Sequence, residues 1–491
     1  MKRLLSLAAV ICVALCTLAQ DYPYDNLYKN LPFKMQKVVR PSFPNRNVDI
    51  RDFGAKGDGT TLCTSAIQNA IDKTAKLGGG KVTVPQGVWY TGPIELRSNI
   101  NLHLEKGAIL LFSPDPDLYP IVSSVFEGLD TKRCKSPISG YSLKNVAITG
   151  DGVIDGNGQY WRPLKREKVT PGYWKEVTSK GGAFIRDGFW IPTEGAKKGY
   201  LMADMNVPTG DLTAEQWDSI KVFLRPVMVN IVDSKNVWLQ GVIFQNSPAW
   251  NVHPLMCENV LIEKVEIRNP SFAQNGDGLD LESCRNALIV NSRFDVGDDG
   301  ICIKSGKDAD GRRRNRPCEN VIVDGCTVFK GHGGFVVGSE MSGGVKNVSV
   351  SNCQFLGTDV GLRFKSKRGR GGVVENIWIK NVSMFDIPTE AVIFNLYYGG
   401  MSAAEAQAAG KNQAEEVKPE PVTEETPCFR NIYIEDVVCR GANRAMFFNG
   451  LPEMPVENIN LKNIDITAKK PAEFKYCKGI NQENVNVSII K

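Results

Sequence analysis

Short stretches that alternate apolar and other residues recur along the chain, and many of them open on an asparagine. The phrase is asparagine, an apolar residue, any residue and another apolar residue, as in NVWL from Asn236 and NVLI from Asn259. Central copies are spaced by roughly 23 to 34 residues, a period typical of solenoids. Alternation favours short strands over helical turns. The copies begin at Asn145, Asn236, Asn259, Asn286, Asn320, Asn347, Asn376, Asn431 and Asn458. We expect these asparagines to bond turn backbone or to stack along the coil axis.

A second phrase recurs out of phase with the first. Its copies DGLDLES (277–283), DGICIKS (299–305), GGFVVGS (333–339) and VGLRFKS (360–366) align without gaps, and AWNVHP (249–254) and AVIFNL (391–396) are looser copies. Two strand phrases in each period predict a single all-β domain, a parallel β-helix with several strands per coil. Alternate residues of each copy fill the core, and their neighbours point outward and stack about 4.8 Å apart. The predicted core positions are Leu279, Leu281, Ile301, Ile303, Phe335, Val337, Leu362 and Phe364.

Three segments interrupt the strand pattern. Residues 60–77 place small and branched apolar residues on one helical face and end in three glycines, which predicts a short helix that caps the N-terminal coil. Residues 156–222 are a long insertion rich in Trp, Lys and Gly, expected to form a wall beside the binding face. Residues 401–427 are polar and poor in apolar residues, which predicts a mobile surface loop.

The chain start predicts export. Residues 1–19 combine a basic start, a short apolar run and a small-residue exit, the pattern of a signal peptide, and Leu15 disfavours lipoprotein cleavage at Cys16. Residues 20–47 follow as an N-terminal extension, and residues 48–491 form the β-helix domain. No later stretch has the length of a membrane span. We therefore expect a periplasmic or secreted protein.

Composition narrows the candidate functions. The chain has 491 residues, 42% of them hydrophobic, and a net charge of +5. This mild excess suits an acidic substrate and is too small to indicate nucleic-acid binding. Eleven of the thirteen cysteines remain after the predicted cleavage, and no CxxC pair occurs. Most of them are expected to be small core residues rather than a disulfide framework or a zinc site. The sequence carries no signal of oligomeric state.

The alignment of the second phrase brings carboxylates together. Asp277 and Asp299 take equivalent places on adjacent coils, Asp298 precedes Asp299, and His332 is the counterpart of Asp298 one coil further on. A polar turn would explain the Asp298–Asp299 pair taken alone. With the third acid in register and a histidine beside them, we favour catalysis by a set of carboxylates. Crowded like charges raise at least one pKa, which suits acid and base roles near neutral pH.

The next outward positions add cations to this strip. The first predicted column is Asn251, Asp280, Cys302, Val336 and Arg363, and the second is His253, Glu282, Lys304, Gly338 and Lys365. Arg363 and Lys365 are two residues apart on one strand and point the same way, a geometry that suits a substrate carboxylate. A merely solvated charged face is the alternative. Three histidines without ligand spacing make a zinc site improbable.

These motifs resemble glycoside hydrolase family 28, the polygalacturonases, which are right-handed parallel β-helices that degrade pectin. The four motifs of that family correspond to NGD (275–277), GDD (297–299), GHG (331–333) and RFK (363–365), in the family's order. DFGAKGDG (52–59) and NSPAW (246–250) are also similar. Gly276 and Phe364 replace the family's usual Thr and Ile. The run 298–316 is more similar to bacterial exo-acting members.

The resemblance implies roles for particular residues. Asp298 would be the general acid, Asp277 and Asp299 would activate water, and His332 would tune the protonation of the acid. Arg363 and Lys365 would bind a galacturonate carboxylate. Further expected substrate contacts are Asn275, Lys304, His253 and Tyr397, although Tyr397 and its neighbour Tyr398 are also candidates for core packing. The implied reaction is inverting hydrolysis of α-1,4-galacturonosyl linkages without a metal or other cofactor.

The sequence leaves four hypotheses about function open. The first is a galacturonan hydrolase, with a lean to exo action. The second keeps hydrolysis but changes the polymer to rhamnogalacturonan or xylogalacturonan. The third is a pectate lyase, which shares the architecture and would need a calcium cage and an arginine base. The fourth is a carbohydrate-binding or adhesive β-helix without catalysis.

Overall fold

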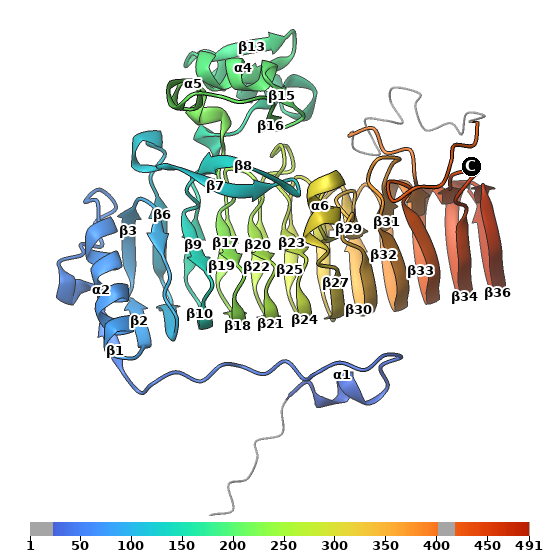
Figure 1. Ribbon diagram of the computed structural model, residues 1–491, viewed down its shortest axis with the longest axis horizontal. Coiled ribbons are helices and arrows are strands. Elements are labelled where there is room, and N and C mark those ends of the chain that lie inside the picture. The colour runs from blue at the N-terminus through green and yellow to red at the C-terminus, as the bar shows by residue number, and fades with distance from the viewer. Residues whose placement is uncertain (1–22, 401–417, 491) are drawn as a thin grey trace, which may run out of the picture.

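The computed structural model describes residues 23–400 and 418–490. These residues wind into one elongated parallel β-helix, and its coils follow one another along the long axis (Figure 1). Neighbouring coils pair in parallel through up to three columns of strands. The predicted signal peptide at residues 1–19 lies outside the described residues, as do residues 401–417 of the predicted loop. Among the described residues no helix is long and apolar enough to cross a membrane.

Three columns of short strands make up the N-terminal and central coils. The front column, which carries the candidate site, contains β4 (Ile94–Glu95), β9 (Ile138–Tyr141), β17 (Val229–Val232), β20 (Val252–Leu255), β23 (Leu279–Glu282), β26 (Asp299–Lys304), β29 (Gly333–Val337) and β31 (Leu362–Lys365). The asparagine column contains β1 (Asn47–Asp49), β2 (Gly80–Val84), β5 (Ile100–Leu104), β10 (Lys144–Gly150), β18 (Lys235–Gln240), β21 (Glu258–Glu263), β24 (Arg285–Val290) and β27 (Cys318–Asp324). The third column contains β3 (Gly87–Thr91), β6 (Ala108–Phe112), β11 (Val153–Asp155), β19 (Ile243–Gln245), β22 (Glu266–Arg268), β25 (Arg293–Asp295) and β28 (Thr327–Lys330).

Toward the C-terminus the strands lengthen and bend around the corners between columns. They are β30 (Val345–Leu356), β32 (Val373–Asn395), β33 (Cys428–Asn449), β34 (Val456–Lys470) and β36 (Cys477–Ile489), with the short β35 (Glu473–Lys475) beside β33. Strands outside the coils are β7 (Ile121–Phe126), β8 (Leu129–Cys134), β12 (Leu164–Lys165), β13 (Ala183–Arg186), β14 (Phe189–Ile191), β15 (Ala203–Asp204) and β16 (Val207–Pro208). The helices are α1 (Asp25–Lys29), α2 (Thr64–Lys76), α3 (Pro171–Thr178), α4 (Glu194–Leu201), α5 (Ala214–Ser219) and α6 (Asp308–Arg314).

An asparagine ladder runs along the asparagine column, as the sequence predicts. The Nδ2 of Asn236 donates to Oδ1 of Asn145 (2.8 Å), and Asn259 donates in turn to Asn236 (3.1 Å). The same bond links Asn286, Asn320 and Asn347 coil by coil. Every one of these asparagines has a positive φ, between 54° and 59°. Asparagine tolerates this left-handed conformation better than most residues, so the repeated phrase marks a corner of the coil.

The front column confirms the predicted core. Leu279 pairs with Ile301, Ile301 with Phe335 and Phe335 with Leu362, and all four side chains are buried. One predicted register is wrong. The looser copy at 249–254 is displaced by two residues, since Val252 pairs with Leu279 and His253 therefore stands opposite Asp280 instead of Glu282.

Helix α2 closes the N-terminal end, in agreement with the predicted cap. It begins at Thr64 rather than residue 60, because Thr60 and Thr61 form a turn whose backbone N–H groups donate to the Asp58 carboxylate. Its buried residues Ile67, Ala70 and Ile71 join the main core.

The N-terminal extension lies along the asparagine column (Figure 1). Tyr24 and Val38 pack with Leu261, Leu288, Val290 and Ile322 from three coils. The buried Glu263 carboxylate anchors this segment: it pairs with Arg40 through two bonds (2.6 and 2.7 Å) and accepts from the Tyr24 hydroxyl and the Trp238 indole. The extension therefore covers apolar positions that would otherwise point to solvent.

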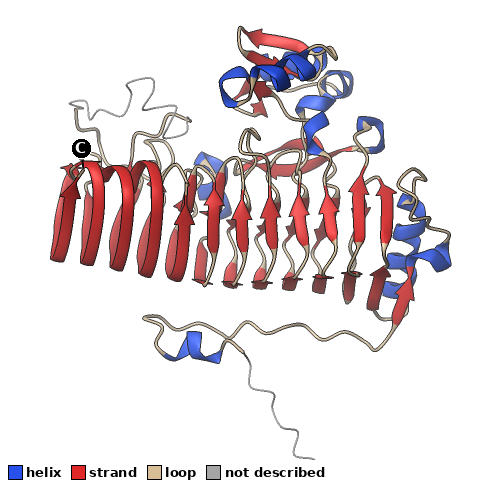
Figure 2. Ribbon diagram, turned by 180° about the vertical axis from the view of Figure 1, so that it is seen from behind, coloured by secondary structure: helices blue, strands red, loops and turns tan. Residues whose placement is uncertain are grey.

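Two additions cover the front column. The insertion after β11 holds α3, α4, α5 and β12–β16 and projects from the coils. Most of the helices lie in this insertion and at the N-terminal end (Figure 2). The β7–β8 hairpin, which the sequence patterns did not predict, lies across the front column (Figure 1). Phe126 from β7 contacts the Trp250 ring, and Asp130 pairs with Arg313 and Arg314 of α6.

All eleven cysteines after the predicted signal peptide are free thiols, and ten of them are buried. The burial of these ten agrees with the prediction that most of the cysteines are small core residues.

The asparagine ladder predicts a graded response at Asn236. Asn236→Ala should lower the thermal unfolding midpoint by an amount corresponding to roughly 1–3 kcal/mol, because alanine is strained at positive φ and the amide bonds are lost. Asn236→Gly relieves the strain and should lose less. Calorimetry at one scan rate measures both. Equal losses in the two variants would show that the backbone conformation contributes nothing.

Candidate active site

The front column brings the three predicted aspartates together. Asp299 is the first residue of β26, and Asp277 lies just before β23 on the preceding coil. The backbone N–H of Gly278 donates to the carbonyl of Asp299 (2.9 Å), which holds the two coils in register. Oxygens of Asp277, Asp298 and Asp299 lie within 4.8 Å of one another. The expectation that these carboxylates converge is therefore confirmed.

Of the three aspartates, only Asp298 is paired with His332. Its Nδ1 lies 2.9 Å from Oδ1 of Asp298, and its backbone N–H donates to the Asp298 carbonyl (2.8 Å). On the other side of the ring, Nε2 lies 3.5 Å from Nζ of Lys168 and 3.9 Å from Oδ2 of Asp359. Lys168 comes from the insertion, so the wall predicted beside the binding face reaches the candidate catalytic groups.

Asp299 is held by two cations from β31. Lys365 donates to Oδ2 (2.7 Å) and Arg363 to Oδ1 (3.2 Å). The Tyr398 ring lies against both cationic groups, with centroid distances of 4.9 Å to Lys365 and 5.7 Å to Arg363. The strip is thus a compact charge network and not a solvated charged face.

The aromatic residue at this network is Tyr398, which corrects the prediction of Tyr397. Tyr397 packs against the main core, and its buried hydroxyl has no hydrogen-bond partner among the described residues. Successive residues at the end of a strand point to opposite faces, so only one of the pair can face the cations.

Asp277 and Asp298 differ in their affinity for protons. Burial raises the pKa of Asp277 well above its usual value, and the charges of Asp280 and Asp298 raise it further. Burial also acts on Asp298, but the charge and hydrogen bond of His332 outweigh it and hold the Asp298 pKa well below its usual range. The predicted raised pKa therefore belongs to Asp277 and not to Asp298.

Two residues predicted to contact substrate are enclosed beneath the hairpin. His253 has a fully buried side chain, with Nε2 2.8 Å from Glu282 and its ring edge-on to Trp250. This corrects its predicted role, because no face of the ring is open. Lys304 is also buried, 2.8 Å from Glu340 and 3.5 Å from Asp280, with its ammonium over Trp250. Glu340, Asp280 and Trp250 together hold Nζ of Lys304 at 3.9 Å from Oδ2 of Asp277.

Asn275, the remaining predicted contact, stays beside the acids. Its Oδ1 accepts from Nη2 of the buried Arg225 (2.8 Å), which orients the loop that carries Asp277. On the opposite side of the acids, a groove is lined by Lys168, Gly297, Lys330, His332 and Asp359. Sequence patterns did not indicate Lys168 or Asp359, since neither belongs to a repeated phrase.

The aspartate trio has the donor set of a hard cation site, with oxygens close enough to share one ion. Arg363 and Lys365 already supply two positive charges to Asp299, so the carboxylates have charge compensation within the protein. The inverting course of the reaction is what the resemblance implies.

A parallel β-helix with clustered carboxylates, a histidine and paired cations on one face suits a polysaccharide-processing enzyme of the hydrolase type. The profile described as "Glycosyl hydrolases family 28" matches residues 219–488, and "Rhamnogalacturonase A/epimerase, pectate lyase-like" matches residues 45–103. The chain belongs to glycosyl hydrolases family 28 and is a glycoside hydrolase. This confirms the predicted fold class, family and enzyme class.

Individual relatives agree with this assignment. A probable polygalacturonase of Vitis vinifera is 28% identical over 425 residues, 84% of this chain and 73% of that protein. The exo-poly-alpha-D-galacturonosidase of Dickeya chrysanthemi is 32% identical over 364 residues, 72% of this chain and 57% of that protein. The solved hyperthermoactive exopolygalacturonase of Thermotoga maritima is 33% identical, with a TM-score of 0.73, and the match covers 92% of this chain and 94% of that one.

The buried Asp280 should make stability depend on pH. Burial raises its pKa well above the usual value; Lys304 opposes this, whereas the charges of Asp299 and Glu340 add to it. An acid with a raised folded-state pKa stabilises the protein at low pH, and this contribution is lost as pH rises through that pKa. Asp280→Asn does not titrate, so its thermal midpoint relative to the native protein should rise between pH 4.5 and pH 8.

The exposed Asp295, changed to Asn, is the matched control and should give a constant difference across this range. A constant difference for Asp280→Asn as well would contradict the protonation assigned to Asp280.

Proposed function

We propose that the protein is an exported exo-acting hydrolase of α-1,4-galacturonosyl linkages in pectic polymers. The observation that carries this proposal is the position of Arg363 and Lys365, which lie within 3.2 Å of Asp299 and beside the two other acids. A carboxylate-bearing sugar at the cleaved linkage suits such a pair of cations. The exo-acting relatives from Dickeya chrysanthemi and Thermotoga maritima support exo action. The signal-peptide pattern at residues 1–19 supports export.

In this proposal Asp277 is the base that removes a proton from water. Its raised pKa favours this role, since a base works best with a pKa near the working pH. Asp299, which is paired with two cations, orients the same water. Asp277 and Asp299 face each other across adjacent coils, so a single water reaches both.

Asp298 is the acid, and His332 tunes its protonation. In the free protein the charge and hydrogen bond of His332 hold the Asp298 pKa well below its usual range, across a contact of 2.9 Å. A substrate carboxylate that binds Arg363 and Lys365 adds negative charge near Asp298. Added negative charge raises the pKa of Asp298, which favours the protonated carboxyl that can donate to the leaving oxygen.

Polygalacturonate free of methyl esters is the test substrate. The native protein should release monomer or dimer from the first time point, and size analysis of the products measures this. A ladder of intermediate oligomers would mean endo action. Asp298→Asn should lower the release of reducing ends by at least about 100-fold, whereas Asp295→Asn should leave it unchanged.

The same assay separates the remaining alternatives. Unsaturated products that absorb ultraviolet light would indicate a lyase. Release of reducing ends from rhamnogalacturonan or xylogalacturonan but not from polygalacturonate would move the activity to that polymer. Polymer binding without any cleavage would indicate a non-catalytic protein.

A further inference from the structure

The outer side of the His332 ring faces two side chains of opposite charge. Its Nε2 lies 3.5 Å from Nζ of Lys168 and 3.9 Å from Oδ2 of Asp359. On the inner side of the ring, Nδ1 lies 2.9 Å from Oδ1 of Asp298. All three side chains on the outer side line the same groove and are partly exposed. The ring therefore links the Asp298 carboxylate to an ammonium and a carboxylate that lie outside the four sequence motifs.

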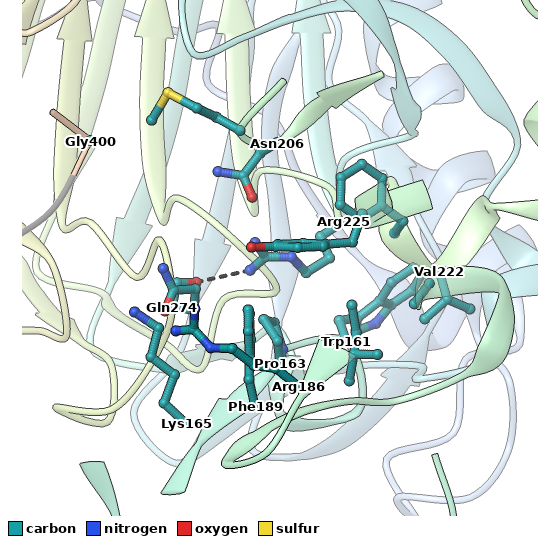
Figure 3. Close-up of a pocket in the computed structure, with 15 residues that line it drawn as sticks. Trp161, Pro163, Lys165, Arg186, Phe189, Asn206, Val222, Arg225, Gln274 and Gly400 are labelled. Atoms are coloured by element: carbon teal, nitrogen blue, oxygen red, sulfur yellow. Dashed lines mark hydrogen bonds between the residues drawn. The ribbon is translucent and has the colours of Figure 1, made fainter. Parts of the chain in front are cut away.

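The base of the insertion places Lys168. This residue ends the 3₁₀ helix η4 (Arg166–Lys168), which directly follows β12 and precedes α3. Figure 3 shows the charged end of Lys165, from β12, pointing toward Gln274. In α3, the ring of Tyr173 lies 5.3 Å from that of Phe272. Gln274 and Phe272 both belong to the loop between β22 and β23, so the segments on either side of Lys168 pack against a coil of the catalytic region.

Asp359 is placed by the coils themselves. It lies shortly before β31, and its backbone N–H donates to the carbonyl of Gly331 (2.8 Å), the residue before His332. Its own carbonyl accepts from the N–H of Thr389 on the following coil (3.1 Å). Two separate parts of the chain thus bring opposite charges to one ring nitrogen.

These charges act on the ring in opposite directions. A nearby carboxylate favours the cationic imidazolium, and a nearby ammonium disfavours it. Other charged groups close to His332 are Asp298 on the inner side, Arg363, whose guanidinium donates to the His332 carbonyl (3.4 Å), and Lys330 on the groove wall. Burial raises the pKa of Asp298, but the charge and hydrogen bond of His332 outweigh it. The charge on the ring therefore governs how readily Asp298 takes up a proton.

We propose that Lys168 and Asp359 are positioning residues that act through His332: Asp359 favours the charged ring, Lys168 opposes it, and their balance sets the protonation of Asp298. Neither residue needs to touch the reacting atoms for this role. The inference rests on the proposed function and deepens it, because it concerns the acid of that reaction. It also gives the insertion a role in the chemistry of the catalytic groups.

The protonation of His332 can be observed without turnover. The chain has three histidines, so labelling the imidazole rings with nitrogen-15 gives a simple magnetic resonance spectrum, and the signals lost in His332→Gln identify this ring. The ring nitrogens are followed from about pH 4 to about pH 9 in the full-length protein. The midpoint of the His332 titration should rise by at least about 0.5 pH unit in Lys168→Met and fall by at least about 0.5 pH unit in Asp359→Asn, because the first variant removes a positive charge and the second a negative one.

Two further variants separate this role from altered packing. Lys168→Arg keeps the charge, and Lys330→Met removes the charge of an exposed lysine in the same groove. Each should move the midpoint by less than about 0.2 pH unit, since solvent and salt screen an exposed charge. A midpoint that shifts in the same direction in Lys168→Met and Asp359→Asn, or that stays unchanged in either, would overturn the inference. A shift in Lys168→Arg as large as that in Lys168→Met would overturn it too.

The hydrolysis assay reports separately on the proposed function. A protein that shows the two opposite shifts without cleaving polygalacturonate rejects only the proposed function. A protein that cleaves the polymer without these shifts rejects only the inference.

Discussion

Parallel pairing between coils, held in one register, is the interaction on which the rest of the structure depends. The asparagine ladder repeats one side-chain bond and one left-handed backbone conformation at a corner of successive coils. Because side chains alternate between faces along a strand, a slip of one residue in β31 would turn Arg363 and Lys365 into the core and Phe364 outward. The aspartate cluster thus follows from alignment: Asp277 and Asp299 are 22 positions apart in the sequence and neighbours in space only because their coils are in register.

The charged strip is enclosed by other parts of the chain. Asp277, Asp299, Arg363 and Lys365 are buried, and burial strengthens every interaction among the charges and makes each unpaired charge costly. Within this enclosure burial raises the pKa of Asp277, and the charges of Asp280 and Asp298 raise it further, whereas the charge and hydrogen bond of His332 lower the pKa of Asp298. Burial and pairing together therefore give two chemically identical side chains different affinities for protons.

Much of the fold and of the aspartate cluster could be predicted from the sequence. A solenoid repeats its local structure, so the aligned phrases gave the register of Leu279, Ile301, Phe335 and Leu362 and with it the convergence of the three aspartates. Features outside the repeat were missed. The β7–β8 hairpin and Lys168 reach the site from segments without periodicity, and the choice of Tyr398 over Tyr397 depends on where a strand ends. The predicted register of His253 is wrong because its copy of the phrase is degenerate: Pro254 stands where the other copies have serine.

The central claim is that the aspartate cluster, and not another part of the long surface, is where a galacturonan linkage is cleaved. A crystal structure of Asp298→Asn with a bound oligogalacturonide tests it most directly. The account predicts a glycosidic oxygen within hydrogen-bond distance of residue 298 and a sugar carboxylate on Arg363 and Lys365. An oligosaccharide bound elsewhere on the β-helix, with no sugar carboxylate on Arg363 and Lys365, would contradict it.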